Sequence, residues 1–264
     1  MLYAAQPLRV DLSAMEAGRI CEYLEWDSSF FGRRIARLTV GRLDTRALKQ
    51  LLEWCKSHAI ECLYFLADAD DAGTARLAEK HEFHFVDIRI TLERALDDIH
   101  ATGGEVLPRG VRLCKAQDLP ALRSIAKVSH RDSRFYNDFH FPTSVCDALY
   151  ETWIEKSCNG YATAVIVAEL ESQPVGYVSC HLLQDKGQIG LFGIAPEARG
   201  QGLGKKLLEG SLRWFAENGV KNLTVVTQGR NCTAQRLYQR GGFLTRSVQL
   251  WYHRWFLPGE SNLE

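Results

Sequence analysis

The chain has 264 residues and balanced charge, with 32 Lys and Arg residues against 32 Asp and Glu residues. This length allows one large domain or two smaller ones. The balance excludes a general electrostatic attraction to nucleic acid or to an anionic membrane, so any anionic ligand must be met by local charge. No apolar stretch approaches the roughly 20 residues of a membrane span, and no signal-peptide pattern is evident. We therefore expect a cytoplasmic protein with neither nucleic acid nor membrane as partner.

The eight cysteines are scattered without a Cys-x-x-Cys pair. In a chain of this size, such spacing argues against a zinc site and against a disulfide framework. It predicts reduced thiols that lie mostly in the core. His81 and His84 in the sequence HEFH resemble a metal signature, but a zinc-binding helix needs His-Glu-x-x-His. The sequence therefore predicts no metal.

The first hundred residues have the pattern of a small α/β unit. Stretches with apolar residues three and four positions apart, as in amphipathic helices, alternate with stretches typical of strands in the order strand-helix-strand-helix-strand. The segment 101–110 combines Gly and Pro without either period, which marks a boundary. We therefore divide the chain into domains at 1–105 and 110–264. The elements expected before the boundary are helices at 47–60 and 71–83 and strands at 62–69 and 85–93.

The second domain has the pattern of a larger α/β (α+β) unit. Turn residues join its first three strands as hairpins, so the sheet should be mixed and mostly antiparallel, with helices on both faces. The last strand alternates large side chains, which predicts cover on both its faces, and the second subunit of a homodimer is one candidate for it. Both domains contain a helix that ends before Glu-Phe or Gly-Phe, without a strong repeat. The expected elements are helices at 118–129, 143–157, 202–219 and 231–242 and strands at 161–170, 175–183, 187–194, 222–227 and 243–256.

The stretch GIAPEARGQGLGKKLLEG at 193–210 follows one expected strand and opens a helix. Gly200, Gly202 and Gly204 remove side chains from the turn. Successive backbone N–H groups can then face one anion, and the helix dipole favours its charge. The lysine and glycine spacings differ from those of a P-loop and of a dinucleotide-binding fingerprint. For an isolated motif, a plain glycine-rich turn is the alternative.

Two motifs occur in a characteristic order: Arg199-x-x-Gly202-x-Gly204, then Asn231-x-x-Ala234-x-x-x-Tyr238-x-x-x-Gly242-Phe243. Together they resemble the GNAT superfamily of acetyl-CoA-dependent N-acetyltransferases over residues 111–256. The resemblance implies the GNAT fold, in which a bulged strand, here ending at Gly193-Ile194, separates from the next one. It implies acetyl-CoA as co-substrate. The implied coenzyme-binding residues are Gly193, Ile194, Arg199, Gly200, Gln201, Gly202, Leu203, Gly204, Lys205 and Asn231.

Three further segments, LEWDSSFFGRRIARL, SRFYNDFHFP and LYETWIEKS, sharpen the resemblance. They are similar to GNAT enzymes that have a small N-terminal domain and acetylate a dTDP-4-amino-4,6-dideoxyhexose. A nucleotide-sugar partner is thereby implied, with Arg134, Phe135, Tyr150 and Trp153 as its binding residues. Arg134 suits a diphosphate because guanidinium groups make bidentate, charge-assisted hydrogen bonds. The alternative for Arg134 is a solvated loop.

Tyr238 is the candidate general acid, because the equivalent tyrosine has that role in the family. Attack by an amine on a thioester requires a neutral amine, support for an oxyanion and a proton for the leaving thiolate. A phenol is protonated at neutral pH and can supply that proton. The backbone N–H of Ile194 is expected to support the oxyanion. The alternative for Tyr238 is a core residue on an amphipathic helix.

Asp87 is the candidate base. Apolar neighbours disfavour its ionised form by desolvation, which suits a group that accepts the proton of the sugar ammonium. Alternatively, strand alternation points Asp87 and Arg89 to solvent and leaves Phe85, Val86 and Ile88 to share the buried contacts.

Two other functions are compatible with the family motifs. A protein or peptide N-acetyltransferase would need an open and often acidic groove, and the neutral chain with its arginine and aromatic loop argues against one. A non-catalytic acyl-CoA-binding protein is the other alternative, and the retention of Tyr238 and Asn231 argues against a loss of chemistry. The sequence favours an N-acetyltransferase that acts on a nucleotide-linked amino sugar.

Overall fold

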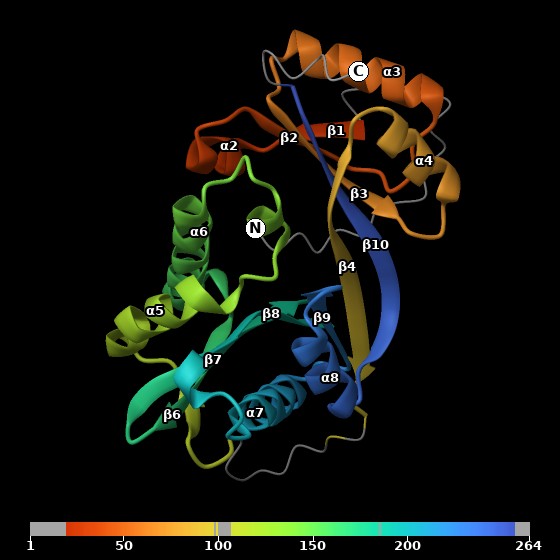
Figure 1. Cartoon of the computed structure of the whole chain (residues 1–264). Helices are drawn as coiled ribbons and strands as arrows, with labels where there is room; N and C mark the ends of the chain where they lie inside the picture. Colours follow the sequence, from red (N-terminus) through yellow and green to blue (C-terminus); the bar gives the residue numbers. More distant parts are fainter. Residues whose placement is uncertain (1–19, 98, 100–106, 185, 257–264) are drawn as a thin grey trace. The chain divides into compact units, whose positions relative to one another are not determined.

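The computed structural model describes residues 20–97, 99, 107–184 and 186–256. Figure 1 labels its helices and strands. The described residues form two compact units: unit 1 has residues 90–136 and 142–247, and unit 2 has residues 20–89, 137–141 and 248–256. Each unit is described by itself.

The elements occur in the following order, apart from short 3-10 and π turns. They are β1 (Cys21–Tyr23), α2 (Glu25–Phe31), β2 (Ile35–Leu38), α3 (Thr45–Ser57), β3 (Cys62–Asp68), α4 (Ala72–Lys80), β4 (His84–Ala95), β5 (Val111–Leu113), α5 (Leu119–Ser129), α6 (Thr143–Lys156), β6 (Ala164–Leu170), β7 (Gln173–Leu183), β8 (Lys186–Ile194), α7 (Leu203–Glu217), β9 (Asn222–Gln228), α8 (Cys232–Arg240) and β10 (Leu244–Trp255).

The compact units do not follow the predicted boundary between residues 105 and 110. The long strands β4 and β10 each contribute residues to both units. Residues 101–106 of the predicted linker lie outside the described residues. That 1–105 and 110–264 are separate domains therefore stays a prediction.

Unit 1 contains the mixed sheet that was predicted. Its strands have the order β10-β4-β9-β8-β7-β6-β5. Pairs β5–β6, β6–β7 and β7–β8 are antiparallel, whereas β8 and β9 are parallel. The hairpin connections between β6, β7 and β8 account for the antiparallel part, because hairpins reverse the chain direction.

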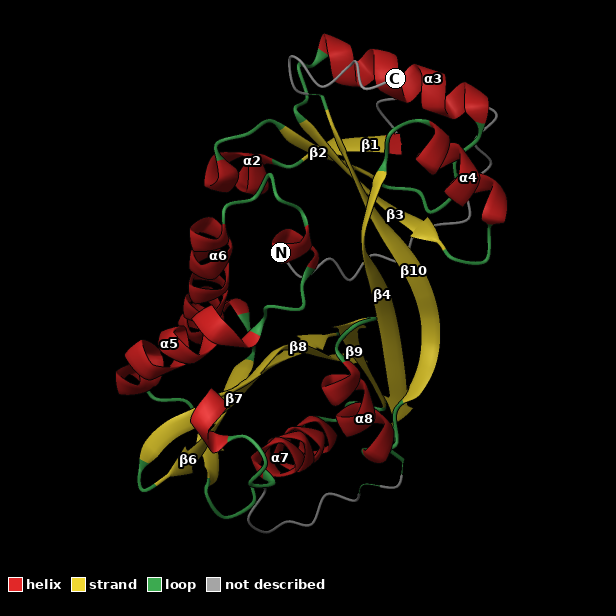
Figure 2. Ribbon diagram, viewed as in Figure 1, coloured by secondary structure: helices red, strands yellow, loops and turns green. Residues whose placement is uncertain are grey.

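Helices cover both faces of this sheet, as predicted (Figure 2). Gly176 and Tyr177 are successive residues of β7, so they face opposite sides. A Cβ on Gly176 would lie 3.2 Å from a methyl carbon of Leu207 in α7. The Tyr177 hydroxyl lies 2.8 Å from Nε2 of His130, at the C-terminal end of α5. Helix α7 therefore covers one face of β7 and α5 the other.

Unit 2 packs its core against alternate residues of β3. Leu63, Phe65 and Ala67 lie in a buried cluster with side chains of α3 and α4 and with Tyr252 of β10. Tyr64 faces the other side, where its ring centroid lies 4.7 Å from that of His253. Both faces of β10 are thus covered within one chain at Tyr252 and His253, whereas its first residues, Leu244, Thr245 and Arg246, are exposed.

Asp138 fixes the segment 137–141 to β10 inside unit 2. One carboxylate oxygen accepts hydrogen bonds from His253 Nδ1 at 2.6 Å and Trp255 Nε1 at 2.9 Å. The other accepts from the backbone N–H and from Nδ1 of His140, at 3.1 and 2.8 Å. Asp138 is 5% exposed. Four donors therefore satisfy one buried carboxylate.

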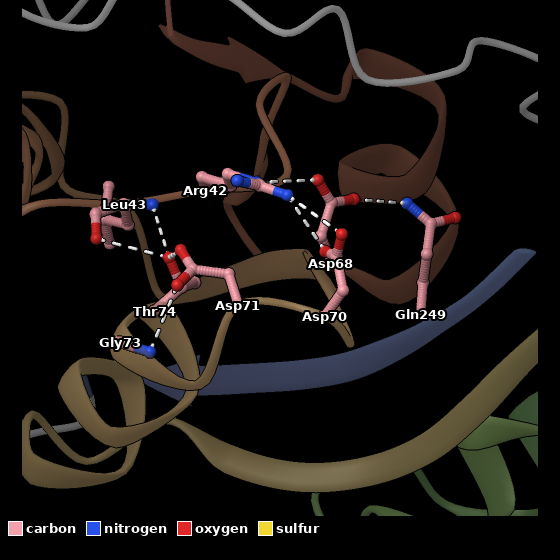
Figure 3. A network of polar contacts seen from close by, with 8 residues as sticks. All are labelled: Arg42, Leu43, Asp68, Asp70, Asp71, Gly73, Thr74 and Gln249. Atoms are coloured by element: carbon pink, nitrogen blue, oxygen red, sulfur yellow. Dashed lines mark hydrogen bonds and ion pairs between the residues drawn. The ribbon is translucent and has the colours of Figure 1, made fainter.

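Polar contacts fix the start of α4 (Figure 3). Asp71 accepts from the Gly73 N–H at 3.1 Å and from the Thr74 hydroxyl at 2.6 Å. The Thr74 hydroxyl oxygen in turn accepts from the Leu43 N–H at 2.9 Å. Asp71 is thus an N-cap of the kind that stabilises the first turn of a helix. The neighbouring contacts join Arg42 to Asp68 and Asp70, and Gln249 to Asp68.

The series β3, α4, β4 recurs as β9, α8, β10. Corresponding elements have equal lengths of 7, 9 and 12 residues, and the residue numbers of all their bounds differ by 160. Asp71 and Asn231 cap the two helices through side-chain oxygens. The sequence disclosed little of this repeat, because few residues are identical in the two copies; the buried Phe83 and Phe243 after the helices are one such pair.

The same backbone hydrogen bond closes both helices of this series. The Phe83 N–H donates to the Ala78 carbonyl at 3.1 Å, and the Phe243 N–H donates to the Tyr238 carbonyl at 3.0 Å. Ala78 therefore occupies in unit 2 the position that Tyr238 occupies in unit 1.

All eight cysteines are free, and five are buried, in agreement with the prediction. Within the described residues, no helix combines the length and the apolar character needed to cross a membrane. In the same part of the chain, no three His, Cys, Asp or Glu side chains are grouped as metal ligands would be.

Candidate functional site

The end of β8 has an open backbone edge in unit 1. Parallel pairing with β9 ends at Ile189, although β8 continues to Ile194, which is the predicted separation of the strands. On the other side, the Ala195 N–H donates to the Val175 carbonyl at 2.8 Å. Because hydrogen-bonded and non-hydrogen-bonded pairs alternate in antiparallel ladders, the next pair, Gly176 with Ile194, is non-hydrogen-bonded. The Ile194 N–H therefore points away from β7, toward the edge that β9 has left.

A β-bulge lies in β8 just before this edge. The register with β7 shifts so that Ser179 faces two residues of β8. The Ser179 hydroxyl accepts a hydrogen bond from the Leu191 N–H at 2.8 Å, which stabilises the irregular backbone. Such a bulge bends its strand and redirects the groups that follow.

A glycine turn, which we call the cradle (residues 199–205), leads into α7. Gly200 and Gly202 have φ angles of 79° and 77°. A Cβ on either would meet nothing within 4 Å, so the left-handed backbone rather than crowding favours glycine. Gly202 is the N-cap of α7 and makes no side-chain cap. The first N–H groups of α7 are therefore oriented, with the positive end of the helix dipole, for an anion.

The other predicted residues of the cradle have distinct positions. Arg199 Nε donates to the Ile194 carbonyl at 3.3 Å, so this exposed cation is tied to the end of β8. Gln201 Nε2 donates to the Glu197 carbonyl at 3.3 Å. Lys205 is exposed on the first turn of α7. A Cβ on Gly204 would make an ordinary contact with Leu237, so neither crowding nor a positive φ requires glycine there.

Tyr238 lies beside the open edge, on α8. Its ring centroid is 6.2 Å from that of Phe192 in β8 and 5.8 Å from that of Phe243. It is 3% exposed, and burial raises the pKa of the Tyr238 hydroxyl above its usual value. The phenol therefore remains protonated at neutral pH.

Asn231 is the N-cap of α8. Its Oδ1 accepts a hydrogen bond from the Ala234 N–H at 3.0 Å. The carbonyl side of the amide thus fixes the start of the helix, and the amide NH₂ group is the part suited to donate to a ligand.

The structure brings together the four residues predicted to bind a substrate. The Arg134 guanidinium lies 4.2 Å from the centroid of the Phe135 ring. The Trp153 ring contacts both Phe135 and Tyr150, at centroid distances of 6.3 and 5.2 Å. Arg134 is 8% exposed, so the alternative of a solvated loop is wrong for this side chain.

His130 and Tyr177 form a polar pair that the sequence did not reveal. Nε2 of His130 lies 2.8 Å from the Tyr177 hydroxyl, and its ring stacks on Tyr150 at 4.5 Å. Burial lowers the pKa of His130 to about 4. A Cβ on Gly193 would lie 2.9 to 3.0 Å from the Tyr177 ring and hydroxyl, so glycine permits the tyrosine to cross the end of β8. These residues are far apart in sequence and meet through the packing of α5 on β7.

Asp87 belongs to unit 2, whereas the other predicted site residues belong to unit 1. It is 3% exposed, and its carboxylate accepts a hydrogen bond from the Ile88 N–H at 2.8 Å. Phe85 is 50% exposed. The alternative that placed Asp87 in solvent and Phe85 among the buried contacts is therefore wrong. Successive residues Val86 and Asp87 are both buried, so the strand is covered on both faces at this point and alternation does not separate core from solvent.

Residues 126–243 match the Acetyltransferase (GNAT) family. The chain is 26% identical over 238 residues to dTDP-fucosamine acetyltransferase of Escherichia coli O6:H1, covering 88% of this chain and 97% of that protein. It is 27% identical over 143 residues to the spore coat polysaccharide biosynthesis protein SpsD of Bacillus subtilis, covering 54% of this chain and 49% of that protein, and thus spans about half the length of that relative.

The fold is similar to that of a GCN5-related N-acetyltransferase from Sphaerobacter thermophilus. The TM-score is 0.62 and the sequence identity 17%, over 90% of this chain and 77% of that one. The family match and the fold coincide with the open strand edge and the cradle of unit 1. The chain thus contains a domain that matches the Acetyltransferase (GNAT) family, in residues 126–243, and its fold is that of GNAT acetyltransferases.

Proposed function

We propose that the protein transfers the acetyl group of acetyl-CoA to the amine of a nucleotide-linked sugar of the dTDP-4-amino-4,6-dideoxyhexose class. The observation that carries the proposal is the open edge of β8 at Ile194, which lies in one unit with the uncapped start of α7 and the protonated phenol of Tyr238. The sugar class is supported by a relative named for fucosamine and another named for polysaccharide biosynthesis.

The cradle fits the pyrophosphate of acetyl-CoA. Two left-handed glycines leave the backbone N–H groups at the start of α7 uncovered by side chains. Arg199 and Lys205 add positive charge at the surface, and the NH₂ group of Asn231 is a further donor for the coenzyme. Acetyl-CoA would supply the thioester carbonyl that the amine attacks.

The reaction then divides between backbone and side chain. The Ile194 N–H stabilises the negative oxygen that develops on the attacked carbonyl, because it is already directed toward the open edge. The Tyr238 hydroxyl donates its proton to the departing thiolate. The aromatic cluster at Arg134 binds the nucleotide sugar, with the guanidinium toward the diphosphate.

A panel of amine acceptors tests the proposed function. Purified protein with acetyl-CoA should acetylate a dTDP-linked 4-amino sugar. UDP- and GDP-linked amino sugars should react at least about tenfold more slowly, because each lost contact of 1.4 kcal/mol changes a rate or affinity by that factor. Release of free thiol measures turnover. Preference for a lysine peptide would replace the sugar proposal with protein acetylation. Acetyl-CoA binding with no turnover of any acceptor would indicate a binding protein.

Substitution of Gly202 by valine tests the cradle. A β-branched residue is unfavourable at a φ of 77°, so the turn should shift and the side chain should fill space above the helix start. We expect affinity for acetyl-CoA to fall at least about tenfold, because hydrogen bonds to charged groups contribute about 1.5–3 kcal/mol each. Isothermal titration calorimetry measures this affinity.

Gly219→Val is the matched control for this change. Gly219 follows the same helix at its other end, has a φ of 75° and would also meet no atom within 4 Å. The Gly219→Val variant has the same backbone strain at a site outside the cradle, so its affinity for acetyl-CoA should stay near that of the wild type. Equal affinities in both variants, with the fold retained, would remove the cradle from coenzyme binding.

A further inference from the structure

The two faces of the β8 end differ in the polar side chains they carry within unit 1. Gly176 and Ile194 face α7, since a Cβ on Gly176 would contact both Ile194 and Leu207. The adjacent pair, Tyr177 and Gly193, faces the opposite side, where α5 ends. Phe192 has the same parity in β8 as Ile194, and its ring contacts Tyr238. The proposed proton donor thus lies on the face of α7.

The opposite face carries the His130–Tyr177 pair. The hydroxyl of Ser129, the residue before His130, lies 3.4 Å from the Ile194 carbonyl oxygen, so the end of α5 is located at the end of β8. His130 is partly exposed, whereas Tyr177 is fully buried. The His130 ring also stacks on Tyr150, one of the proposed acceptor-binding residues. An imidazole is therefore oriented at the reacting end of the strand by one hydrogen bond and one stacking contact.

We propose that His130 accepts the proton that the attacking amine nitrogen must lose, and that Tyr177 is its positioning residue. This inference rests on the proposed function. As the new C–N bond forms, one N–H bond of the amine breaks and its electron pair stays on nitrogen. The proton passes to Nδ1 of His130, and the positive charge moves from the amine nitrogen to the imidazole. Nε2–H then donates to the Tyr177 oxygen, which favours the charged ring, and the proton leaves through the exposed edge of His130.

The acid–base requirements agree with this assignment. Burial keeps the pKa of His130 low, so the ring is neutral and has a lone pair at neutral pH. A neutral imidazole is a weak base toward a free ammonium ion, but the nitrogen becomes strongly acidic once it is bonded to the thioester carbon. Burial also raises the pKa of Tyr177, so this phenol stays neutral and accepts a hydrogen bond without competing for the proton. Tyr238, which donates a proton to the thiolate, and His130, which accepts a proton from the amine, thus lie on opposite faces of β8.

Chemical rescue tests the proposal on the full chain. His130→Ala and His130→Gln should lower kcat by about 10²-fold with the preferred amine, the lower end of the range for general base catalysis. Acetyl-CoA affinity by calorimetry should be unchanged, since the cradle lies on the other face. Added imidazole should restore activity to His130→Ala several-fold and leave His130→Gln unrescued, because glutamine fills the site. Tyr177→Phe should lower kcat less, with KM nearly constant.

His58→Ala serves as the control, since His58 is an exposed histidine of unit 2. It should keep wild-type rates with and without imidazole. Suppose that the wild type turns over and that kcat of both His130 variants lies within about threefold of the wild-type value. This result would overturn the inference about His130 and leave the proposed function standing, because a general base contributes far more than that. If Asp87→Asn lowers kcat and added imidazole does not restore activity to His130→Ala, the proton acceptor is Asp87 instead. Absence of wild-type turnover with every amine would contradict the proposed function itself.

Discussion

Replacement of Tyr238 by phenylalanine should lower turnover by about 100-fold, the lower end of the range for general acid catalysis, because coenzyme A leaves as a moderately acidic thiol. The substitution keeps the ring that packs against Phe192 and Phe243 and removes the hydroxyl. Stability and acetyl-CoA affinity should therefore change little. If the hydroxyl acts in the transition state, kcat and kcat/KM should fall together.

Tyr252→Phe is the matched control for this experiment. Tyr252 is equally buried, but it belongs to the core of unit 2, where its hydroxyl lies 3.5 Å from Glu79. Its turnover should stay close to that of the wild type. Turnover, coenzyme affinity and melting temperature should be measured on the same preparations. Near-normal turnover in Tyr238→Phe would remove this residue from the mechanism, and a lower melting temperature with intact specific activity would make it a core residue.

Removal of the Asp138 carboxylate should have the largest effect on stability. Asp138→Ala leaves the donors of His253, Trp255 and His140 without their buried acceptor. We expect the free energy of unfolding to fall by about 3–5 kcal/mol, as for other buried charged groups that lose a partner. Urea unfolding at pH 7 measures this difference. Asp138→Asn keeps the size and one acceptor oxygen, so its loss should be smaller.

The acid dependence of the same carboxylate has a defined sign. Burial raises the pKa of Asp138, but hydrogen bonds and charge from His253, with hydrogen bonds from Trp255 and His140, outweigh burial, so its pKa lies below the usual value. A depressed pKa gives stability that is fully present above the unfolded value of about 3.9 and is lost as the pH falls through the folded value. The stability difference between wild type and Asp138→Asn should therefore persist at pH 6 and shrink below about pH 4. A difference that grows in acid would contradict this assignment.

The longer elements were predictable because their patterns are local. Helices α3, α5, α6, α7 and α8 and the strands from β6 to β10 lie within a few residues of their expected bounds. The short elements β1, β2, β5 and α2 were not located: one strand was expected before α3, but without bounds. Strands of three or four residues, and a helix of seven, have too few positions to display a period. Their formation depends on pairing and packing partners that are remote in sequence.

The site shows the same contrast. The turn of the cradle was predictable, since alternate glycines before a helix determine its geometry locally. The His130–Tyr177 pair was not, because residues 47 positions apart meet through a strand pair and a helix packed on it. No local signal marks either residue. Asp87 illustrates the opposite error. The alternating pattern of its strand allowed an exposed side chain as the alternative, but tertiary packing buries this side chain.

The duplicated series of strand, helix and strand allows the two copies to be compared residue by residue. Both copies share a polar cap before the helix and a buried Phe after it, features that stabilise the helix start and the core in each. Features that differ belong to only one copy's task. Ala78 stands where Tyr238 does. The helix that precedes each copy also differs at its start: Asp44 caps α3 with a carboxylate that accepts a hydrogen bond from the Ala47 N–H, whereas the N-cap of α7 is Gly202, which makes no side-chain cap. The start of α3 is therefore occupied by a side chain of the protein itself, whereas the start of α7 is left to its backbone.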